Sequence, residues 1–347
     1  MPKIVFTGGG SAGHVVPNTA IAAELSADKK NKLFYIGTNG IEKRLISHTG
    51  MPFFEIDCPK FTRSFSLKNA AIPFALTAAV RSARRILKEL CPDLVFSKGG
   101  FVSLPVVLAA AKEKIPFLTH ESDLTPGLTT RLIAKKCRYV LTSFPETAKL
   151  FPNGKFSGSP LRNELFIQKR TGYVRGDGKK TLLVFGGGSG SRAINDAVFK
   201  NLDELLKFCR VLHVVGEKNL SAAPVKEGYT PIGYEKNMAI LYQKADAAVA
   251  RAGSNTLFEL LALRIPSLIV PLEKGSRGDQ KQNAEYFAKR GLIRVVTESE
   301  LPEKLVKSVG ALFQDAALQS SLCDNPFRLS GNAIVLQTIQ EVLGAEK

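Results

Sequence analysis

Two glycine-rich loops, about half a chain apart, each follow a short apolar run and precede a helical pattern. The first is TGGGSAGHVVP at residues 7–17, and the second is FGGGSGS at residues 185–191. A strand-length apolar run, a glycine turn and a helical apolar period together form the βαβ unit of a parallel sheet. We therefore expect an α/β fold with two Rossmann-like halves, each a doubly wound parallel sheet.

Further apolar runs of strand type continue this rhythm. They are KIVFT, KLFYIGT, DLVFS, PFLTHE and RYVLTSF in the first half, and TLLVF, RVLHVV, AAVA and SLIVPLE in the second. The rhythm breaks in the polar stretch 157–175, so we expect one domain at 1–163 and another at 164–347. The last segment, residues 332–343, is predicted to be helical, and the sequence leaves open on which of the two halves it packs.

Composition narrows the class of partner. The chain has 48 Lys and Arg against 31 Asp and Glu, a net charge of +17, which favours a polyanion such as anionic lipid or a phosphorylated ligand. Nucleic acid is disfavoured, because no nucleic-acid module is recognisable and the basic residues are not interleaved with aromatics. No apolar window has the length of a membrane span, and the scattered cysteines indicate reduced thiols in a cytosolic protein.

The glycine loops are candidate anion sites. Glycine lets the backbone approach a ligand closely, and the helix behind it offers unpaired N–H groups. A dinucleotide site would need an acidic residue at the end of the second strand, but KLFYIGT ends in Gly37 and Thr38. The alternative is that the glycines only permit tight turns between strand and helix.

His14 directly follows the first loop, at the start of a helix. The helix N-terminus disfavours the imidazolium, so we expect a neutral ring that can accept a proton near pH 7. The alternative is an ordinary capped, hydrogen-bonded histidine.

The stretch RAGSNTLFE at residues 251–259 is a second candidate. Ser254, Asn255 and Thr256 offer hydroxyl and N–H groups to a phosphate, and Glu259 lies one turn further on, where it could bind two ribose hydroxyls. The alternative is helix capping, with Ser254 or Asn255 as the N-cap.

Seven motifs occur in order between residues 4 and 290. They are TGGGSAGHVVP, FSKGGFVS, HESDLTPG, GSPLR, FGGGSGSRAIN, RAGSNTLFELL and RGDQKQNA. In this order they resemble the MurG family, the UDP-N-acetylglucosamine:lipid I N-acetylglucosaminyltransferases of bacterial peptidoglycan synthesis.

The resemblance implies the GT-B fold, with two Rossmann-like domains facing a cleft. The C-terminal half would bind UDP-GlcNAc and the N-terminal half undecaprenyl-linked lipid I, on the cytoplasmic face of the cell membrane. Transfer would invert the anomeric carbon without a cofactor or a metal, and RGDQ contains no DxD-type pair.

The resemblance also implies residue roles. His14 would remove the acceptor proton, with Glu121 as second candidate, and Arg162 would approach the diphosphate. The residues implied for the UDP-GlcNAc site are Ser11, Ala12, Gly13, Asp123, Arg162, Gly188, Ser189, Glu235, Ser254, Asn255, Thr256, Glu259, Gln280 and Asn283.

Several positions depart from the usual family pattern. Ser11-Ala12 stands where Thr-Gly is common, Ser122-Asp123 replaces Gln-Asn, and Gly188-Ser189 replaces Ser-Gln. Phe101, on the acceptor side, stands where tyrosine is usual. These departures affect the expected sugar contacts more than the phosphate-binding loops.

The stretch 61–90 suggests how the protein meets a lipid-linked substrate. One helical face, with Leu76, Val80, Ala83, Leu87 and Leu90, is predicted to be core. The expected acceptor and membrane residues are Phe61, Phe65, Phe74, Arg81, Arg85, Lys88 and Phe101, which would contact an anionic phospholipid surface. The alternative is an ordinary amphipathic helix with a solvated basic edge.

Other functions stay open at this point. A different GT-B enzyme, such as a diacylglycerol glycosyltransferase or a UDP-GlcNAc 2-epimerase, would share the glycine loops. A catalytically inactive, membrane-bound scaffold that binds a UDP-sugar is an alternative from another class. A nicotinamide oxidoreductase is third, because the ribose-binding acid is missing.

Overall fold

The structure is a computed structural model that describes residues 1–59, 72–167, 178–187, 190–273, 277–327 and 329–345. The chain forms two compact units: unit 1 is Met1–Arg162 with Arg328–Lys347, and unit 2 is Asn163–Phe327. The chain therefore leaves unit 1 once and returns to it, so that the final helix belongs to the first unit.

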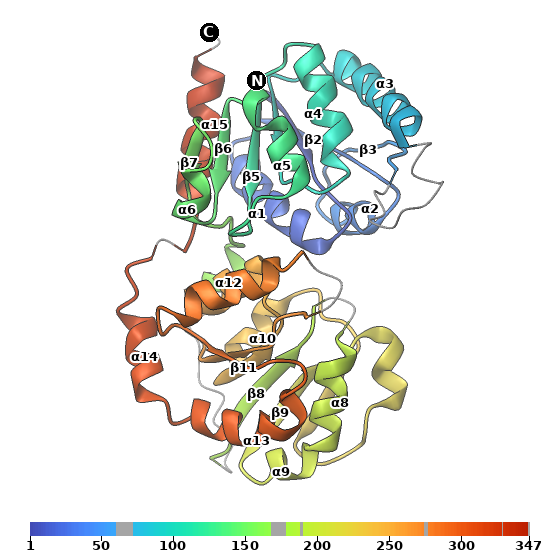
Figure 1. Cartoon of the computed structure of the whole chain (residues 1–347). Helices are drawn as coiled ribbons and strands as arrows, with labels where there is room; N and C mark the ends of the chain where they lie inside the picture. Colours follow the sequence, from blue (N-terminus) through green and yellow to red (C-terminus); the bar gives the residue numbers. More distant parts are fainter. Residues whose placement is uncertain (60–71, 168–177, 188–189, 274–276, 328, 346–347) are drawn as a thin grey trace. The chain divides into compact units, whose positions relative to one another are not determined.

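Unit 1 is built on a parallel sheet of seven strands in the order β3-β2-β1-β4-β5-β6-β7 (Figure 1). Its strands are β1 (Lys3–Thr7), β2 (Lys32–Gly37), β3 (Phe53–Glu55), β4 (Leu94–Ser97), β5 (Phe117–Glu121), β6 (Tyr139–Thr142) and β7 (Gly154–Phe156). Because β1 pairs with both β2 and β4, the strand order reverses beside β1, where open α/β sheets bind ligands.

Helices cover both faces of this sheet. Along β1, Val5 joins one buried cluster while Ile4 and Phe6 join the other, as the strand's alternation requires. The first cluster contains residues of α3 (Ile72–Leu90), α4 (Ser103–Lys112) and α5 (Leu128–Ile133). The second contains residues of α1 (Val16–Ser26), α2 (Ile41–Ile46) and α15 (Asn332–Gly344), and a short helix, α6 (Pro145–Ala148), follows β6.

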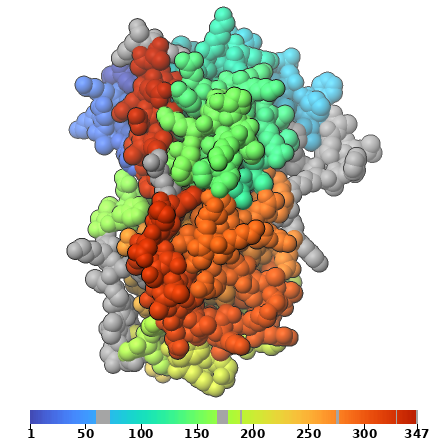
Figure 2. Space-filling model, turned by 60° about the vertical axis from the view of Figure 1, so that its left-hand side comes forward, coloured from blue at the N-terminus to red at the C-terminus, as the bar shows by residue number. Residues whose placement is uncertain are grey.

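The last helix, α15, is part of the core of unit 1. Val335, Ile339 and Val342 are buried against Ile4, Phe6 and their neighbours. Figure 2 shows this red helix between the blue N-terminal residues and the green residues of unit 1. Just before it, the Ser159 N–H donates to the Leu329 carbonyl at 3.0 Å, and the Gly331 N–H donates to the Ser159 carbonyl at 2.7 Å. The two segments that connect the units thus lie side by side.

Unit 2 has a parallel sheet of six strands in the order β10-β9-β8-β11-β12-β13. Its strands are β8 (Lys180–Phe185), β9 (Cys209–Val214), β10 (Tyr229–Ile232), β11 (Ala247–Ala250), β12 (Ser267–Ile269) and β13 (Arg294–Val295). Its helices are α7 (Glu164–Ile167), α8 (Arg192–Lys200), α9 (Leu202–Leu206), α10 (Met238–Lys244), α11 (Ser254–Ala262), α12 (Asp279–Ala288), α13 (Leu301–Leu312) and α14 (Ala316–Cys323). The prediction of two doubly wound parallel sheets is confirmed.

Candidate active site

The first glycine loop lies at the carboxyl end of β1 and packs against the turn that follows β4. A Cβ atom on Gly8 would lie 2.6 Å from the His14 carbonyl oxygen, and one on Gly100 would lie 2.4 Å from the Gly9 carbonyl oxygen. Both distances are too short for any side chain, so this close approach of two backbones requires glycine. The glycines thus do more than permit a turn: they bring two strand ends together.

His14 ends a short 3-10 turn, Ala12–His14, that leads into α1. Its Nδ1 lies 3.1 Å from the Gly9 carbonyl oxygen and 3.0 Å from the Ser11 hydroxyl. A carbonyl oxygen only accepts, so Nδ1 carries the hydrogen and Nε2 is the basic nitrogen of the neutral ring. The ring is half-buried, which leaves it within reach of solvent.

A buried carboxylate supports this loop from beneath. Glu42 has no exposed surface, and its side chain accepts hydrogen bonds from the Gly10 N–H at 3.3 Å and the Thr38 N–H at 3.1 Å. A Cβ atom on Gly9 would lie 2.7 Å from the Glu42 carboxylate. Sequence analysis did not identify Glu42, because it is far from the loop along the chain.

The other side of the loop is held by two uncharged polar side chains. The Asn18 amide donates to the Thr7 carbonyl at 3.1 Å, and the Tyr35 hydroxyl donates to the Gly8 carbonyl at 2.7 Å. Burial raises the pKa of Tyr35 well above its usual value, so this hydroxyl keeps its proton. These two hydrogen bonds therefore fix the orientation of the Thr7 and Gly8 carbonyl groups at the carboxyl end of β1.

Glu121 lies at the end of β5 with its carboxylate turned toward the start of α5. It accepts from the Asp123 N–H at 3.2 Å, the Gly127 N–H at 2.8 Å and the Thr130 hydroxyl at 2.7 Å. These contacts satisfy free N–H groups near a helix start and fix the connection that carries Ser122 and Asp123.

The remaining predicted residues of unit 1 have different surroundings. Ser11 is exposed, whereas Ala12, Gly13, Asp123 and Arg162 are half-buried. The ring of Phe101 lies over Gly10, whose Cβ, if it had one, would be 2.5 Å from the Phe101 Cε1. Phe101 therefore packs on the glycine loop itself.

The second glycine loop, at the carboxyl end of β8, has the same property. A Cβ atom on Gly190 would lie 2.0 Å from the Val215 carbonyl oxygen, and one on Gly186 would lie 2.2 Å from the Ser191 Cβ. The predicted residues Gly188 and Ser189 lie outside the described residues.

Arg251 connects this loop to the neighbouring strand ends of unit 2. Its guanidinium donates to the Ser191 hydroxyl at 2.7 Å and to the Val270 carbonyl at 3.2 Å, and it forms an ion pair with Glu298. Both charged side chains are mostly buried, at 11% and 19% exposure. The ends of β8, β11, β12 and β13 are thus joined through one side chain that sequence analysis did not assign to the site.

The residues after β11 turn directly into α11. Gly253, in an extended conformation, is the N-cap and Ser254 is the first helical residue. The alternative in which Ser254 or Asn255 is the N-cap is therefore wrong. Further along α11, the buried carboxylate of Glu259 accepts from the Tyr242 hydroxyl at 2.8 Å, which fixes its orientation.

A cavity of about 620 Å³ lies at this end of unit 2. Among the sequence-predicted residues that the structure describes, Gln280 lines it; its side-chain oxygen accepts from the Leu272 N–H at 3.0 Å. Asn283, one turn further along α12, is buried, and Glu235 accepts from the Asn237 N–H at 2.7 Å just before α10. The cavity is lined by Gly186, Gly190, Ser191, Arg192, Ala193, Asp196, Arg251, Leu272, Gln280 and Glu298.

Helix α3 has the amphipathic character that the sequence predicts. Val80, Ala83 and Leu87 are buried, which confirms the core face, and Phe74 is 81% exposed. Arg81, Arg85 and Lys88 are exposed on the other side, while Phe61 and Phe65 lie outside the described residues.

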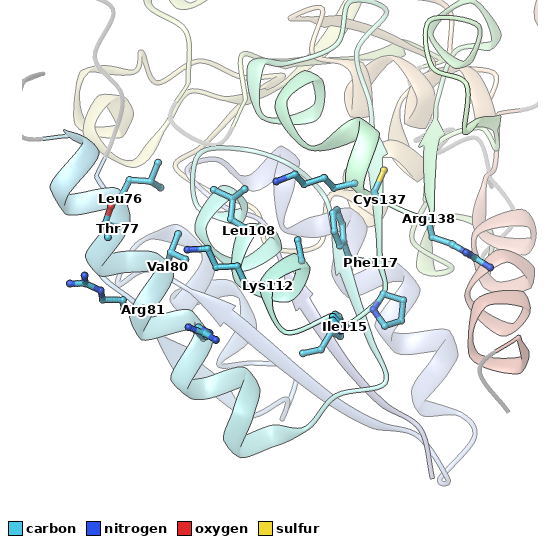
Figure 3. A pocket seen from close by; sticks show the side chains of 15 residues that line it. Leu76, Thr77, Val80, Arg81, Leu108, Lys112, Ile115, Phe117, Cys137 and Arg138 are labelled. Carbon is cyan, nitrogen blue, oxygen red and sulfur yellow. The ribbon is translucent and has the colours of Figure 1, made fainter.

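A second cavity, of about 840 Å³, lies in unit 1 between α3, α4 and the residues around β5 (Figure 3). Its lining combines apolar and cationic side chains: Leu76, Thr77, Val80, Arg81, Arg84, Leu108, Ala111, Lys112, Lys114, Ile115, Pro116, Phe117, Lys136, Cys137 and Arg138.

None of the helices in the described part of the chain is long and apolar enough to cross a membrane.

Comparison with known proteins gives a consistent match over most of the chain. Residues 4–142 match the glycosyltransferase family 28 N-terminal domain, and residues 181–327 match the corresponding C-terminal domain. A protein of Clostridium botulinum (strain Langeland) is 42% identical over 328 residues, covering 91% of this chain and 92% of its own length. It is named UDP-N-acetylglucosamine–N-acetylmuramyl-(pentapeptide) pyrophosphoryl-undecaprenol N-acetylglucosamine transferase.

Solved structures agree on the fold. The crystal structure of Acinetobacter baumannii MurG matches with a TM-score of 0.76 and 24% identity, covering 98% of this chain and 100% of that chain. The calicheamicin glycosyltransferase CalG4 matches with a TM-score of 0.74 and 16% identity, covering 99% and 98%. Each unit is thus a Rossmann-like domain of the GT-B glycosyltransferase type. Together with the two domain matches and the identity to the clostridial protein, this shows that the chain belongs to glycosyltransferase family 28 and, within it, to the MurG family.

Proposed function

We propose that this protein transfers N-acetylglucosamine from UDP-GlcNAc to the C4 hydroxyl of N-acetylmuramic acid in undecaprenyl-linked lipid I, forming lipid II for peptidoglycan synthesis. The observation that carries the proposal is the 42% identity, over 91% of the chain, to a transferase named for this reaction. The polar strand ends of both units would supply the groups that such a transfer needs.

Unit 2 would hold the donor. The N–H groups at the start of α11, with Ser254, Asn255 and Thr256, would bind phosphate, and the carboxylate of Glu259 would bind the ribose hydroxyls. Gln280, which lines the cavity of unit 2, would bind the sugar. The buried Asn283 lies on α12, the same helix as Gln280, and would support the position of that helix. We propose Glu235 and the 188–189 turn for binding of the nucleotide on the family resemblance only.

Unit 1 would supply the proton acceptor. We favour Nε2 of His14 over the Glu121 carboxylate, because Glu121 already accepts three hydrogen bonds near the start of α5. Both oxygens of the Glu121 carboxylate are therefore already engaged within unit 1 and turned toward α5. Glu121 would instead position Asp123.

The reaction then follows as a single displacement. Nε2 of His14 takes the proton from the acceptor hydroxyl as its oxygen attacks the anomeric carbon on the side opposite the UDP. The bond from that carbon to the diphosphate oxygen breaks, and its electron pair leaves with UDP. Backbone N–H groups of the loops, together with Arg162, stabilise the growing negative charge, which is expected to be the larger contribution to catalysis.

The exposed face of α3 would contact the membrane. Phe74 is 81% exposed, and Arg81, Arg85 and Lys88 follow it along the same helix. A basic residue near an anionic bilayer contributes about 1 kcal/mol and a buried phenylalanine about 1.5–3 kcal/mol, so a few of them suffice for reversible binding. The protein would then act at the cytoplasmic face as a peripheral enzyme.

Two experiments test these proposals. Transfer of radiolabel onto a lipid I analogue is compared for UDP-GlcNAc, UDP-glucose and UDP-galactose; a lack of preference for UDP-GlcNAc would show that the donor is wrongly assigned. Flotation with anionic and neutral vesicles tests the surface. Equal binding to both vesicle types would rule out the electrostatic contribution, and Phe74→Ser should weaken binding to anionic vesicles.

A further inference from the structure

A buried relay of hydrogen bonds in unit 2 ends at the second glycine loop. It runs from Tyr229 through His213 and Asn195 to the carbonyl group of Val215, directly after β9. The oxygen of this carbonyl group would lie 2.0 Å from a Cβ atom on Gly190. Because the two backbones approach so closely, the place of the Val215 carbonyl group limits where Gly190 can lie.

The Val215 carbonyl group also sets the direction of every hydrogen bond in the relay. Its oxygen can only accept, so Asn195 turns its NH₂ group to this oxygen, at 2.9 Å, and its own side-chain oxygen to His213. Nε2 of His213, 3.1 Å from the Asn195 oxygen, must then carry the hydrogen, and Nδ1 accepts from the Tyr229 hydroxyl at 3.1 Å. The Asn219 amide donates to the same carbonyl group at 2.8 Å. The relay thus has one arrangement in which all of its hydrogen bonds are made.

The relay keeps this arrangement at neutral pH. Asn195 is 3% exposed, His213 has no exposed surface and Tyr229 is 6% exposed. Burial lowers the pKa of His213 to about 3 and raises the pKa of Tyr229 above its usual value, so the imidazole stays neutral and the phenol keeps its proton. Apolar side chains of similar shape can replace a buried hydrogen-bonded pair at little cost, so filling space does not by itself require this relay.

We propose that Asn195 is a positioning residue for the donor: oriented by His213, its amide holds the Val215 carbonyl group against Gly190 and so keeps the second glycine loop in place for UDP-GlcNAc. The proposal rests on the proposed function, which assigns this loop to the nucleotide. Ala193 and Asp196 of α8 line the cavity of unit 2, whereas the Asn195 side chain is directed to β9. Asn195 would therefore act on the donor through Val215.

The first test is Asn195→Asp, which keeps the size of the side chain but removes the amide donor. A carboxylate oxygen would face the Val215 carbonyl oxygen and repel it, so the KM for UDP-GlcNAc should rise about tenfold while the KM for the lipid I analogue stays unchanged. Asn201→Asp is the matched control, because Asn201 lies at the other end of α8 and donates to the Ala197 and Pro302 carbonyls, both at 2.9 Å. It should change neither KM. A wild-type KM for UDP-GlcNAc in Asn195→Asp would overturn the proposal.

A second pair of variants keeps the proposal testable if Asn195→Asp does not fold. His213→Leu removes the donor to the Asn195 oxygen, whereas the amide of His213→Gln can place an N–H group where Nε2 now lies. If the ring orients Asn195, the KM for UDP-GlcNAc should rise about threefold or more in His213→Leu and stay close to the wild-type value in His213→Gln. A ring that only filled space would be replaced as well by leucine, so equal KM values in the two variants would contradict the assignment.

Hydrogen exchange of the Gly190 amide separates this proposal from the proposed function, because it needs no substrate. This N–H group donates to the Gly187 carbonyl at 3.0 Å and should exchange faster in Asn195→Asp than in Asn201→Asp. If the wild type transfers no GlcNAc but this difference is seen, the proposed function fails and the part of Asn195 in holding the loop stands. If transfer is present and the difference is absent, the role given to Asn195 is wrong.

Discussion

Nδ1 of His14 lies 3.1 Å from the carbonyl oxygen of Gly9, and this contact sets which ring nitrogen can take up a proton. Because Gly9 belongs to the glycine loop, the loop conformation and the tautomer of the histidine depend on one another. Under the proposed function, the Gly9 carbonyl group would therefore prepare the base, because it fixes the hydrogen on Nδ1.

If Nε2 of His14 is the base, His14→Ala should lower kcat/KM by about 10²–10⁴-fold. The acidic limb of the pH profile should also disappear, because protonation of this ring would no longer limit the rate. Ser11→Ala is the control, since it removes a neighbouring hydroxyl 3.0 Å from Nδ1 but keeps the ring. An acidic limb that survives in His14→Ala would transfer the role to another group.

Glu42→Gln should destabilise unit 1. The Gly10 and Thr38 N–H groups donate to different oxygens of the carboxylate, so in the amide one of them would face an NH₂ group instead of an acceptor. We therefore expect a loss of about 1–3 kcal/mol in the free energy of unfolding. Denaturant unfolding measures it. The control is Glu55→Gln, which removes an exposed ion pair with Lys43 and should cost under about 1 kcal/mol. Equal effects of the two substitutions would mean that the buried carboxylate does not hold the loop.

Arg251→Met should weaken both folding and donor binding. It leaves Glu298 mostly buried without its counter-charge, which costs about 3 kcal/mol, and it releases the loop that carries Ser191. We therefore expect a lower melting temperature and a higher KM for UDP-GlcNAc. Lys207→Met, which breaks an exposed ion pair of unit 2, should change neither. A change in stability with an unchanged KM would restrict Arg251 to a structural role.

Glu259 should act through the ribose hydroxyls. Glu259→Gln is expected to raise the KM for UDP-GlcNAc about tenfold, and Tyr242→Phe should raise it less, because Tyr242 only orients the carboxylate. A donor whose ribose lacks one hydroxyl is the decisive comparison: wild type and Glu259→Gln should then differ much less. If the variant loses the same factor with both donors, Glu259 does not bind the ribose.

Acid should destabilise the protein in part through His213. Burial lowers its pKa from 6.5 to about 3, and its ring lies 3.1 Å from both the Asn195 side-chain oxygen and the Tyr229 hydroxyl. Between pH 6.5 and pH 3 the unfolded chain binds a proton that the folded chain does not, so this contribution to stability is present above pH 6.5 and lost as pH falls.

The measurement for His213 is the free energy of unfolding at several pH values. In this window His213→Gln should reduce its slope by about 1.4 kcal/mol per pH unit. The exposed His48 provides the comparison position, and His48→Gln is measured in the same way. An unchanged slope in His213→Gln would show that this ring titrates normally.

The central strands could be predicted from sequence, but the outermost ones could not. The strands β1 and β8 contain the continuous apolar runs IVF and LLVF, because both strands are covered on both faces. By contrast β3, β7, β10 and β13 are short, lie at the edges of their sheets and read FFE, GKF, YTPI and RV. An edge strand needs neither length nor an apolar run, so its sequence carries little signal.

The candidate site divides in a similar way. His14 and the start of α11 each follow a strand and a glycine turn. This pattern is local along the chain, so both parts of the candidate site could be predicted from sequence. Glu42 supports the first loop from a different helix, and the contacts of Arg251 with Ser191 and Glu298 join segments far apart along the chain. No local pattern encodes such contacts.

The hydrogen-bonded segments around Ser159 and Gly331 determine where this chain can be truncated and where its second unit can be exchanged. Since α15 completes the core of unit 1, a fragment that stops after Arg162 would lack Val335, Ile339 and Val342 and should aggregate. Residues 163–327, in contrast, form one continuous segment of the chain, and the residues of unit 1 just before and just after it are hydrogen-bonded to each other. Exchanging this segment for that of another glycosyltransferase, with both junctions placed there, should preserve the acceptor-side scaffold and change only the nucleotide sugar it is given.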